Sequence, residues 1–408
     1  MYFDIENYKK KVDLKQFQYT KKQILKKISI RYNKKKLSDF SFLHQNNKKL
    51  FKTIDNINNT FTNFERILLV GTGGSSLGSK AILEAAFNNK ITYLENIDPN
   101  YLVQKISAVK GQKLLLLIIS KSGETTEILS IFQVLETYFP RLFNFKDDSI
   151  IITENRNSLL NNISNERKIK FIEHNPDIGG RFSCFSETGL LPAKLVGLNT
   201  NYIKKLSDKT FIEYLEKNKF LFAENISTLF NLIKKKYKGH VVLSYQESLQ
   251  SMLLWYRQLW GESLGKKGKG IHLMPAIGSI DQHSQLQMWL DGPDNLIYTI
   301  ILPQKRIKDF KIKDKFKILP DYLNNKSLGN ILNSMGIATF KELVRANRPV
   351  RVIYLDSDSL YPAIKLMSYF MLEVAVLGKQ LDINPFNQPA VEKVKLLTKK
   401  ILKKNGKS

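Results

Sequence analysis

Short runs of apolar residues alternate with segments of helical spacing along most of this chain. In its first half, the apolar runs are residues 66–70, 113–119 and 149–153. Each of the first two ends in a turn rich in glycine or hydroxyl side chains, and helical spacing follows the turn. Continuous apolar strands that alternate with helices predict a parallel sheet covered on both faces, with ligands bound at the carboxyl ends of its strands.

The second half of the chain repeats this order. Apolar strands are predicted at residues 240–244, 295–302 and 350–355. Helical spacing follows the last of them over residues 361–377, whereas residues 310–348 are polar and predict only scattered helical turns. We therefore predict an α/β protein with two similar domains, each a three-layer α/β/α sandwich around a parallel sheet. The predicted segments are a helical N-terminal arm at residues 1–59, a first domain at 60–200, a second at 201–376, and a C-terminal turn and helix at 377–408.

One predicted helix carries a Gln and a Glu on a single face. Its apolar positions recur at helical spacing: Leu249, Met252, Leu253, Tyr256, Leu259 and Trp260. This pattern predicts an amphipathic helix that ends at a Leu264-Gly265 turn. Gln258 and Glu262 are four residues apart and so share a face. A carboxylate in the last turn meets the negative end of the helix dipole, which is a poor choice for stability alone and suits a proton carrier. A solvated carboxylate at a helix end is the alternative.

Two turns have the composition of anion-binding sites. Residues 71–78 place free backbone N–H groups and hydroxyls before a helix, where the helix dipole favours a phosphate. Neither familiar motif fits, because Ser76 stands where a dinucleotide fingerprint needs glycine and Ser79-Lys80 reverses the order of a P-loop. Residues 120–127 are denser, with four hydroxyls and one ammonium around a predicted helix start. Capping uses one or two such hydroxyls, so we predict a phosphate-monoester site at this second turn.

One arginine and one histidine lie in contexts that favour a functional role. Arg181 follows a Gly-Gly pair, where the backbone can approach a ligand closely. His283 is flanked by polar residues, unlike a packed core histidine. The other histidines lack that setting: His44, His174, His240 and His272. No two histidines have metal-ligand spacing, so no metal site is predicted.

The chain has 408 residues, 43% of them hydrophobic, and a formal net charge of +27. This length and composition predict a globular protein of about two to three domains. Most of the positive charge comes from Lys spread along the chain, with clusters at residues 9–11, 34–36, 234–236 and 399–404. Because no interleaved aromatics or binding module accompany these clusters, we interpret them as solvated faces and predict no nucleic-acid partner. A positive field still attracts anionic small substrates.

The single cysteine, Cys184, excludes an intramolecular disulfide, a zinc cluster and a Cys-x-x-Cys redox site. The N-terminus has acidic residues and a Lys run but no apolar signal region, and no apolar run approaches the ~20 residues of a membrane span. We therefore expect a cytoplasmic protein without a membrane partner.

Several motifs follow one another from about residue 65 to the end of the chain: GTGGSSLG, SKSGETTE, GGRFS, QLWGESLGK, DQHSQ and LGKQLDINPFNQP. Together they closely resemble the glucose-6-phosphate isomerase family of the bacterial type. The resemblance implies two sugar-isomerase (SIS) domains and a homodimer with its active sites at the subunit interface. It also implies reversible isomerisation of glucose 6-phosphate and fructose 6-phosphate through a cis-enediolate, in glycolysis and gluconeogenesis. No cofactor is implied, because the hydrogen moves as a proton.

The resemblance also implies roles for residues of this sequence. Glu262 matches the base that moves a proton between C1 and C2, and Arg181 matches the cation that stabilises the developing oxyanion. His283, supplied by the partner subunit, and Lys379 match the pair that opens the sugar ring. The implied substrate-binding residues are Gly74, Ser75, Ser120, Lys121, Ser122, Thr125 and Gln258.

Some positions depart from the family pattern. Ser76 and Glu124 stand where members often have Asp and Thr, and the N-terminal region is shorter than in the larger members. Glu127 is a candidate to orient His283 through a carboxylate-imidazole contact, or else a solvated acid in the first turn of a helix. The resemblance leaves open whether mannose 6-phosphate is also isomerised.

Two other functions fit parts of the sequence. An NAD-dependent dehydrogenase would use the turn at residues 71–78, with Glu95 as the ribose-binding acid, but it gives no role to the second turn or to Glu262. A non-catalytic sugar-phosphate sensor would use the same SIS-type domain, but it would not need Glu262, His283 and Lys379 together. Turnover of fructose 6-phosphate distinguishes the enzyme from the sensor.

Overall fold

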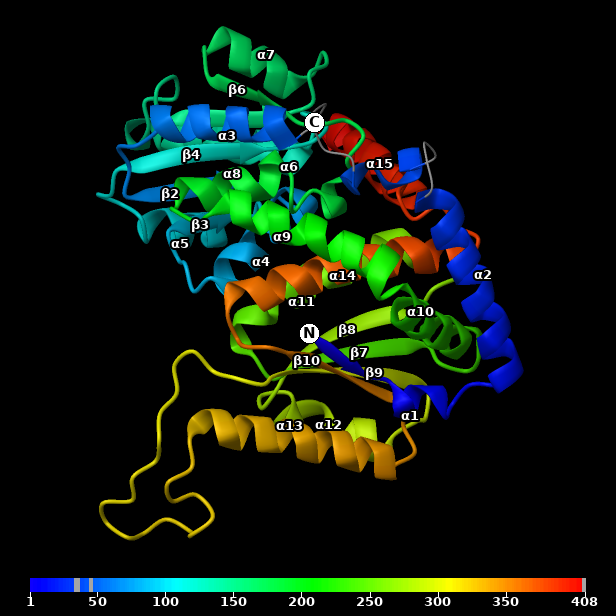
Figure 1. Cartoon of the computed structure of the whole chain (residues 1–408). Coiled ribbons are helices and arrows are strands. Elements are labelled where there is room, and N and C mark those ends of the chain that lie inside the picture. Colours follow the sequence, from blue (N-terminus) through cyan, green and yellow to red (C-terminus); the bar gives the residue numbers. More distant parts are fainter. Residues whose placement is uncertain (33–36, 44–46, 406–408) are drawn as a thin grey trace.

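Two five-stranded sheets, with helices between and outside them, make up the protein (Figure 1). The computed structural model describes residues 1–32, 37–43 and 47–405. The lysine cluster at residues 34–36 and His44 lie outside the described residues. The predicted α/β class, with mainly parallel sheets covered by helices, is confirmed.

The first sheet is wholly parallel and carries both predicted anion-binding turns. Its strand order is β3-β2-β4-β5-β6. The strands are β2 (Arg66–Val70), β3 (Ile91–Leu94), β4 (Leu114–Ile119), β5 (Ser149–Thr153) and β6 (Lys170–Glu173). Strands β2 and β4 are hydrogen-bonded neighbours, with Arg66 opposite Leu114 and Val70 opposite Ile118. The turns that follow these two strands therefore meet at the same carboxyl edge of the sheet.

The second sheet has one antiparallel strand at its edge. Its order is β1-β10-β9-β7-β8. The strands are β1 (Tyr2–Asp4), β7 (Gly239–Ser244), β8 (His272–Ile277), β9 (Leu296–Pro303) and β10 (Val350–Leu355). Strand β1 pairs antiparallel with β10, so this sheet is not wholly parallel as predicted, and the N-terminal arm begins with a strand rather than a helix. Three residues are too few for an alternating pattern to be recognised in a sequence.

Helices from both halves of the chain fill the space between the sheets (Figure 1). The central helices are α4 (Leu77–Ala85), α9 (Thr200–Ile212), α11 (Gln250–Leu264) and α14 (Leu360–Gln380). Helix α11 packs against both α4 and α14. The predicted amphipathic pattern of α11 is confirmed, since its predicted apolar positions are buried, with Trp255 and Trp260 fully so, whereas Gln258 and Glu262 lie on the more open face.

Among the described residues, α14 is the one helix that is long and apolar enough to cross a membrane, judged by length and composition. The apolar run was not recognised in the sequence because Lys365, Glu373 and Lys379 interrupt it. In the fold, 83% of its most apolar window is buried inside the protein. This burial is typical of a core helix.

Each sheet has its own apolar core on its outer face. Helices α5 (Pro99–Ser107), α6 (Thr126–Tyr138) and α7 (Leu159–Glu166) cover the first sheet, and α12 (Gln282–Asp291) and α13 (Leu328–Arg345) cover the second. Helix α13 lies in the segment for which the sequence predicted only scattered turns, and a capping box at Ser327 begins it. The other helices are α1 (Glu6–Lys9), α2 (Leu14–Tyr32), α3 (Asn47–Thr60), α8 (Glu187–Leu195), α10 (Lys219–Lys234) and α15 (Pro389–Asn405).

A buried ion pair joins the second sheet to the helices between the sheets. Arg351 of β10 and Glu373 of α14 have fully buried side chains and share two hydrogen bonds, of 2.6 and 3.1 Å. Tyr256 of α11 donates a third hydrogen bond to Glu373, and Arg351 Nε donates to Thr299 Oγ1 of β9 (2.8 Å). The pair therefore fixes α11 and α14 against the sheet.

Replacing Glu373 with Gln leaves the Arg351 charge buried without its counter-ion. We expect Glu373→Gln to lower the free energy of unfolding by about 3–5 kcal/mol, measured by urea denaturation at one protein concentration. The matched control is Glu342→Gln, which breaks an exposed pair with Arg345 and should cost less than about 1 kcal/mol. Equal losses in the two variants would contradict the structural role of the buried pair.

Candidate active site

The end of α11 presents a carboxylate held by two neighbours. Glu262 lies in the last turn of the helix, and its side chain is 27% exposed. Gln258, one turn earlier, donates from Nε2 to Glu262 Oε1 (2.9 Å), which confirms that the two side chains share a face. Arg181 donates from Nη1 to Glu262 Oε2 (3.1 Å). The carboxylate is therefore oriented from both sides.

Arg181 is almost fully buried and has an acceptor for each of the five N–H groups of a guanidinium. Its acceptors are Ser263 Oγ (2.8 Å), Glu262 Oε2 (3.1 Å), Gln388 Oε1 (2.9 Å), and the carbonyl oxygens of Pro385 (2.6 Å) and Asn387 (3.0 Å). Burial lowers the pKa of the Arg181 guanidinium, and the Glu262 carboxylate opposes this shift. The cation is therefore held between the end of α11 and residues 385–388, a segment we call the C-terminal turn.

Two glycines bring the turn after β2 against these residues. Gly73 has a φ of +58°, and a Cβ atom there would lie 2.8 Å from Gln258 Nε2. A Cβ atom on Gly74 would lie 2.2 Å from the carbonyl carbon of Gly180, the residue before Arg181. A side chain at either position would push the turn away from α11 or from the backbone that carries Arg181. The predicted site residues Gly74 and Ser75 therefore lie beside the Arg181–Glu262 pair.

The turn after β4 collects hydroxyl groups at the start of α6. Ser120 Oγ lies 2.8 Å from Thr125 Oγ1, and Ser122 Oγ lies 3.5 Å from the same atom. Thr125 occupies the N-cap position of α6, but its side chain caps no backbone N–H group of the helix. The hydroxyls therefore bond mainly with one another, which leaves helix capping as a poor explanation of this cluster.

Lys121 connects the turn after β4, which we call the hydroxyl turn (residues 120–127), to the segment before Arg181. Its ammonium donates to the carbonyl oxygens of Pro176 (2.8 Å) and Ile178 (3.0 Å), and it lies 3.5 Å from Glu154. Ile178 is three residues before Arg181. Together with the pairing of β2 and β4, this contact brings three parts to one region: the hydroxyl turn, Arg181, and the turn after β2, which we call the glycine turn (residues 71–78). A phosphate-binding role for the Lys121 side chain stays a prediction.

The two residues expected to open the sugar ring occupy different places. His283 is exposed on α12, on the outer face of the second sheet, whereas α11 lies on the inner face (Figure 1). Lys379 lies near the end of α14, with its ammonium 5.8 Å from the ring centre of Phe386. Phe386 in turn packs against Phe182, next to Arg181. Lys379 is thus close to the C-terminal turn, and His283 lies across the sheet from Glu262.

Ser76 and Glu124, which depart from the family pattern, both have structural partners. Glu95 accepts hydrogen bonds from Ser76 Oγ (2.7 Å) and Lys80 Nζ (2.6 Å), so its carboxylate holds the glycine turn. This arrangement disfavours the role of a ribose-binding acid. Glu124 accepts the backbone N–H of Leu159 (2.8 Å) and so holds the start of α7. Glu127 is exposed in the first turn of α6, and its proposed contact with His283 stays a prediction.

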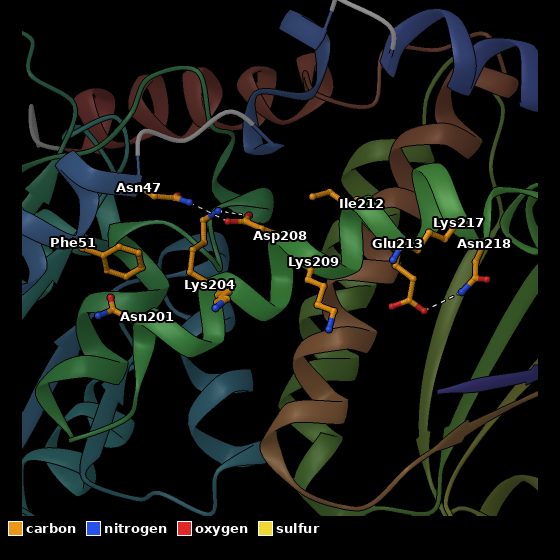
Figure 2. Close-up of a pocket in the computed structure, with 11 residues that line it drawn as sticks. Asn47, Phe51, Asn201, Lys204, Asp208, Lys209, Ile212, Glu213, Lys217 and Asn218 are labelled. Carbon is orange, nitrogen blue, oxygen red and sulfur yellow. Dashed lines mark hydrogen bonds and ion pairs between the residues drawn. The ribbon is translucent and has the colours of Figure 1, made fainter.

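A separate cavity of about 590 Å³ opens between α3 and α9 (Figure 2). None of the predicted site residues lines it. Lys204, almost fully buried, pairs there with Asp208, to which Asn47 also donates a hydrogen bond (3.0 Å). The buried charge of Lys204 is therefore paired within this cavity, which disfavours the cavity as an active site.

Residues 28–280 match the model of a family described as phosphoglucose isomerase. The chain belongs to the phosphoglucose isomerase family. A glucose-6-phosphate isomerase of Thermus thermophilus is 30% identical over 352 residues, which cover 83% of this chain and 84% of that protein.

Solved structures share this fold. The crystal structure of a hypothetical protein from Thermus thermophilus superimposes with a TM-score of 0.86 and 26% identity, covering 98% of this chain and 99% of that one. A glucose-6-phosphate isomerase from Chlamydia trachomatis shares the fold with a TM-score of 0.75 at 19% identity, covering 88% of this chain and 73% of that one. The predicted pair of SIS-type sheets is thereby confirmed.

Two residues of this candidate site were missed by the sequence analysis. Ser263 and Gln388 both accept hydrogen bonds from Arg181. Each lies inside a motif that carries the family resemblance, QLWGESLGK or LGKQLDINPFNQP, and that position was the available signal. Their role depends on a cation far away in the sequence, which no local pattern reveals.

The contact between Gly74 and Gly180 predicts that the first glycine is needed for activity. Gly74→Ala puts a Cβ atom against the backbone before Arg181, and the resulting displacement should lower the isomerase kcat by about 10²-fold. The matched control is Gly179→Ala, whose Cβ atom would have its nearest neighbour at 3.9 Å and should leave kcat within about twofold. Circular dichroism checks that both variants fold. Similar activities of the two variants would contradict the close-approach argument.

Proposed function

We propose that this protein interconverts glucose 6-phosphate and fructose 6-phosphate by proton transfer between C1 and C2. The observation that carries the proposal is the Arg181–Glu262 pair, with Gln258 beside it, at the edge where the glycine turn and the hydroxyl turn meet. The family membership gives the reaction class. The pair supplies a carboxylate and a fixed positive charge, which are the groups this chemistry needs.

Glu262 acts as the base in the proposed mechanism. Starting from the open-chain aldose, its carboxylate removes the proton from C2, and the electrons of the C–H bond form a C1–C2 double bond while the carbonyl oxygen becomes an oxyanion. The proton of the C2 hydroxyl passes to the oxyanion on C1, Glu262 then returns its own proton to C1, and the oxygen on C2 becomes the ketose carbonyl. Gln258 and Arg181 hold the carboxylate in place, so little reorganisation is needed when the proton moves.

Arg181 stabilises the oxyanion of the cis-enediolate. Because all five of its N–H groups already have acceptors, the oxyanion must share or replace an acceptor at the guanidinium. The Nη1 atom is the suitable one, since its acceptors are the side chains of Glu262 and Gln388, whereas Nη2 binds backbone carbonyls. Side chains can move aside at lower cost than a folded backbone turn.

The hydroxyl turn binds the phosphate group of the substrate in this proposal. Ser120, Ser122 and Thr125 gather at the N-terminal end of α6, where the positive end of the helix dipole favours a dianion. The net charge of +27 adds a general attraction for sugar phosphates. These contacts bind the substrate and the transition state alike, whereas the Arg181–Glu262 pair acts on the reacting carbons.

A homodimer is the second part of the proposal. His283 is exposed and lies across the sheet from Glu262, so a second copy would supply it to the site, where it would open the sugar ring with Lys379. Large apolar side chains are exposed on the same side of the molecule. They are Ile280 and Met288 by α12, and Phe310, Phe316, Ile318 and Tyr322 in the loop before α13, which projects from the body in Figure 1. Exposed apolar residues in such number favour a protein partner.

The rival functions are less well supported. A dehydrogenase would need Glu95 to be available to a ribose, but Ser76 and Lys80 already hold its carboxylate. A sugar-phosphate sensor would need the hydroxyl turn but not a carboxylate held against a buried cation. The cost of burying Arg181 is better explained by catalysis than by binding alone.

Changing Glu262 to Gln tests the proposed base. Glu262→Gln should lower kcat for fructose 6-phosphate by about 10²- to 10⁴-fold, with little change in substrate affinity because the phosphate contacts remain. A coupled assay of glucose 6-phosphate formation measures kcat, and calorimetry measures binding. The matched control is Glu247→Gln, at the exposed start of the same helical segment, which should keep wild-type activity. Binding without turnover by the wild-type protein would instead identify a sensor.

Mixing two inactive variants tests the shared site. In a heterodimer of Glu262→Gln and His283→Ala chains, one site carries both substitutions and the other carries neither. Random assembly makes half of the dimers mixed, so co-expression should return about a quarter of wild-type activity. Each variant expressed alone is the control and should stay nearly inactive. If the mixture stays as inactive as its components, His283 does not act across an interface.

A further inference from the structure

A lysine just beyond α11 bonds the same two segments that hold Arg181. The Lys266 ammonium donates to the carbonyl oxygens of Ser263 (3.0 Å) and Asn384 (2.7 Å). Ser263 lies in the last turn of α11, and Asn384 immediately precedes the C-terminal turn. Lys266 is therefore a second cation, besides Arg181, that links the end of α11 to the C-terminal segment.

The position of Arg181 depends on how far apart these segments lie. Two of its acceptors belong to the end of α11, and the other three belong to the C-terminal turn. Asn384 and Pro385 are consecutive residues. Lys266 donates to the carbonyl of Asn384, and Arg181 donates to the carbonyl of Pro385. A shift of the turn relative to the helix would therefore move the guanidinium away from Glu262.

We propose that Lys266 is a positioning residue for the isomerisation. By holding the carbonyls of Ser263 and Asn384, it sets the gap between α11 and the C-terminal turn, so that Arg181 meets the oxyanion that forms opposite Glu262. The proposal rests on the proposed function, since it takes from there the roles of Arg181 and Glu262. Lys266 acts through Arg181 and not on the substrate.

The surroundings of Lys266 make its contribution sensitive to pH. Burial and then the Arg181 charge lower the pKa of Lys266 to about 8, and Glu262 opposes them. On the side of the C-terminal turn, the Lys266 ammonium contacts the Asn384 carbonyl. Lys269, in the same loop as Lys266, donates instead to the Leu381 carbonyl (2.7 Å). Lys266 therefore loses its proton, and with it the charge on both hydrogen bonds, as the pH rises through about 8.

This titration affects activity and stability in opposite directions. The pKa of Lys266 falls from an ordinary value of 10.5 to about 8 on folding, so between these values the unfolded chain binds more protons than the folded one. The contribution of this group to stability therefore rises with pH across that window. Loss of the Lys266 proton therefore does not destabilise the fold. A fall in kcat between these pH values is then not caused by unfolding.

Two substitutions of Lys266 test the proposal with fructose 6-phosphate as the probe. Lys266→Met should lower kcat by about tenfold while KM stays within about twofold, because the phosphate contacts belong to the first sheet. Lys266→Arg should restore most of kcat and remove the decline of activity around pH 8, because a guanidinium stays protonated there. If Lys266→Met does not fold, the pH profile of Lys266→Arg carries the test.

The matched control is Lys269→Met, which removes the neighbouring bond to the Leu381 carbonyl. It should keep both kcat and the decline around pH 8. The proposal is overturned if Lys266→Met keeps wild-type kcat, if Lys269→Met reproduces its loss, or if Lys266→Arg leaves the pH profile unchanged. An inactive wild-type protein would instead refute the proposed function, so the two failures are distinguishable.

Discussion

A buried guanidinium must have acceptors for all its N–H groups, and in this protein that requirement shapes the site. Arg181 satisfies it with groups from the end of α11 and from the C-terminal turn, which lie far apart in the sequence. An unpaired cation at this depth would cost several kcal/mol, so the fold is stable only when these segments converge. The carboxylate of Glu262 is oriented as part of the same arrangement. The group that would stabilise the reaction also assembles the place where it occurs.

The regular part of the fold could be predicted from the sequence because its signals are local. Strand β5 and strand β10 were predicted with their observed bounds, since each contains a run of consecutive apolar residues beside polar residues. Strand β1 and helix α13 were missed because the first is too short for a pattern and the second is interrupted by Gly, Asn and Ser residues. The positions of the predicted domain boundaries stay a prediction.

The site could be predicted only as far as its residues lie close in the sequence. Gln258 and Glu262 are one helical turn apart, and the hydroxyls of residues 120–125 are concentrated in one turn, so spacing and composition indicated both. Ser263, Lys266 and Gln388 were not indicated, because each depends on a partner from another segment. His283 was recognised by its polar context, but only the structure shows that it lies on the opposite side of the second sheet from Glu262.

The pairing of β1 with β10 has a consequence for the order in which the chain can fold. Tyr2 lies opposite Tyr354, so the edge of the second sheet is completed by two strands separated by most of the polypeptide. Contacts of such long range pay a large entropy of loop closure, and they form after the local units have folded. During synthesis β1 cannot pair until β10, the last strand of the sheet, has been made. The docking of the N-terminus is therefore a late event that reports whether the whole second sheet has folded.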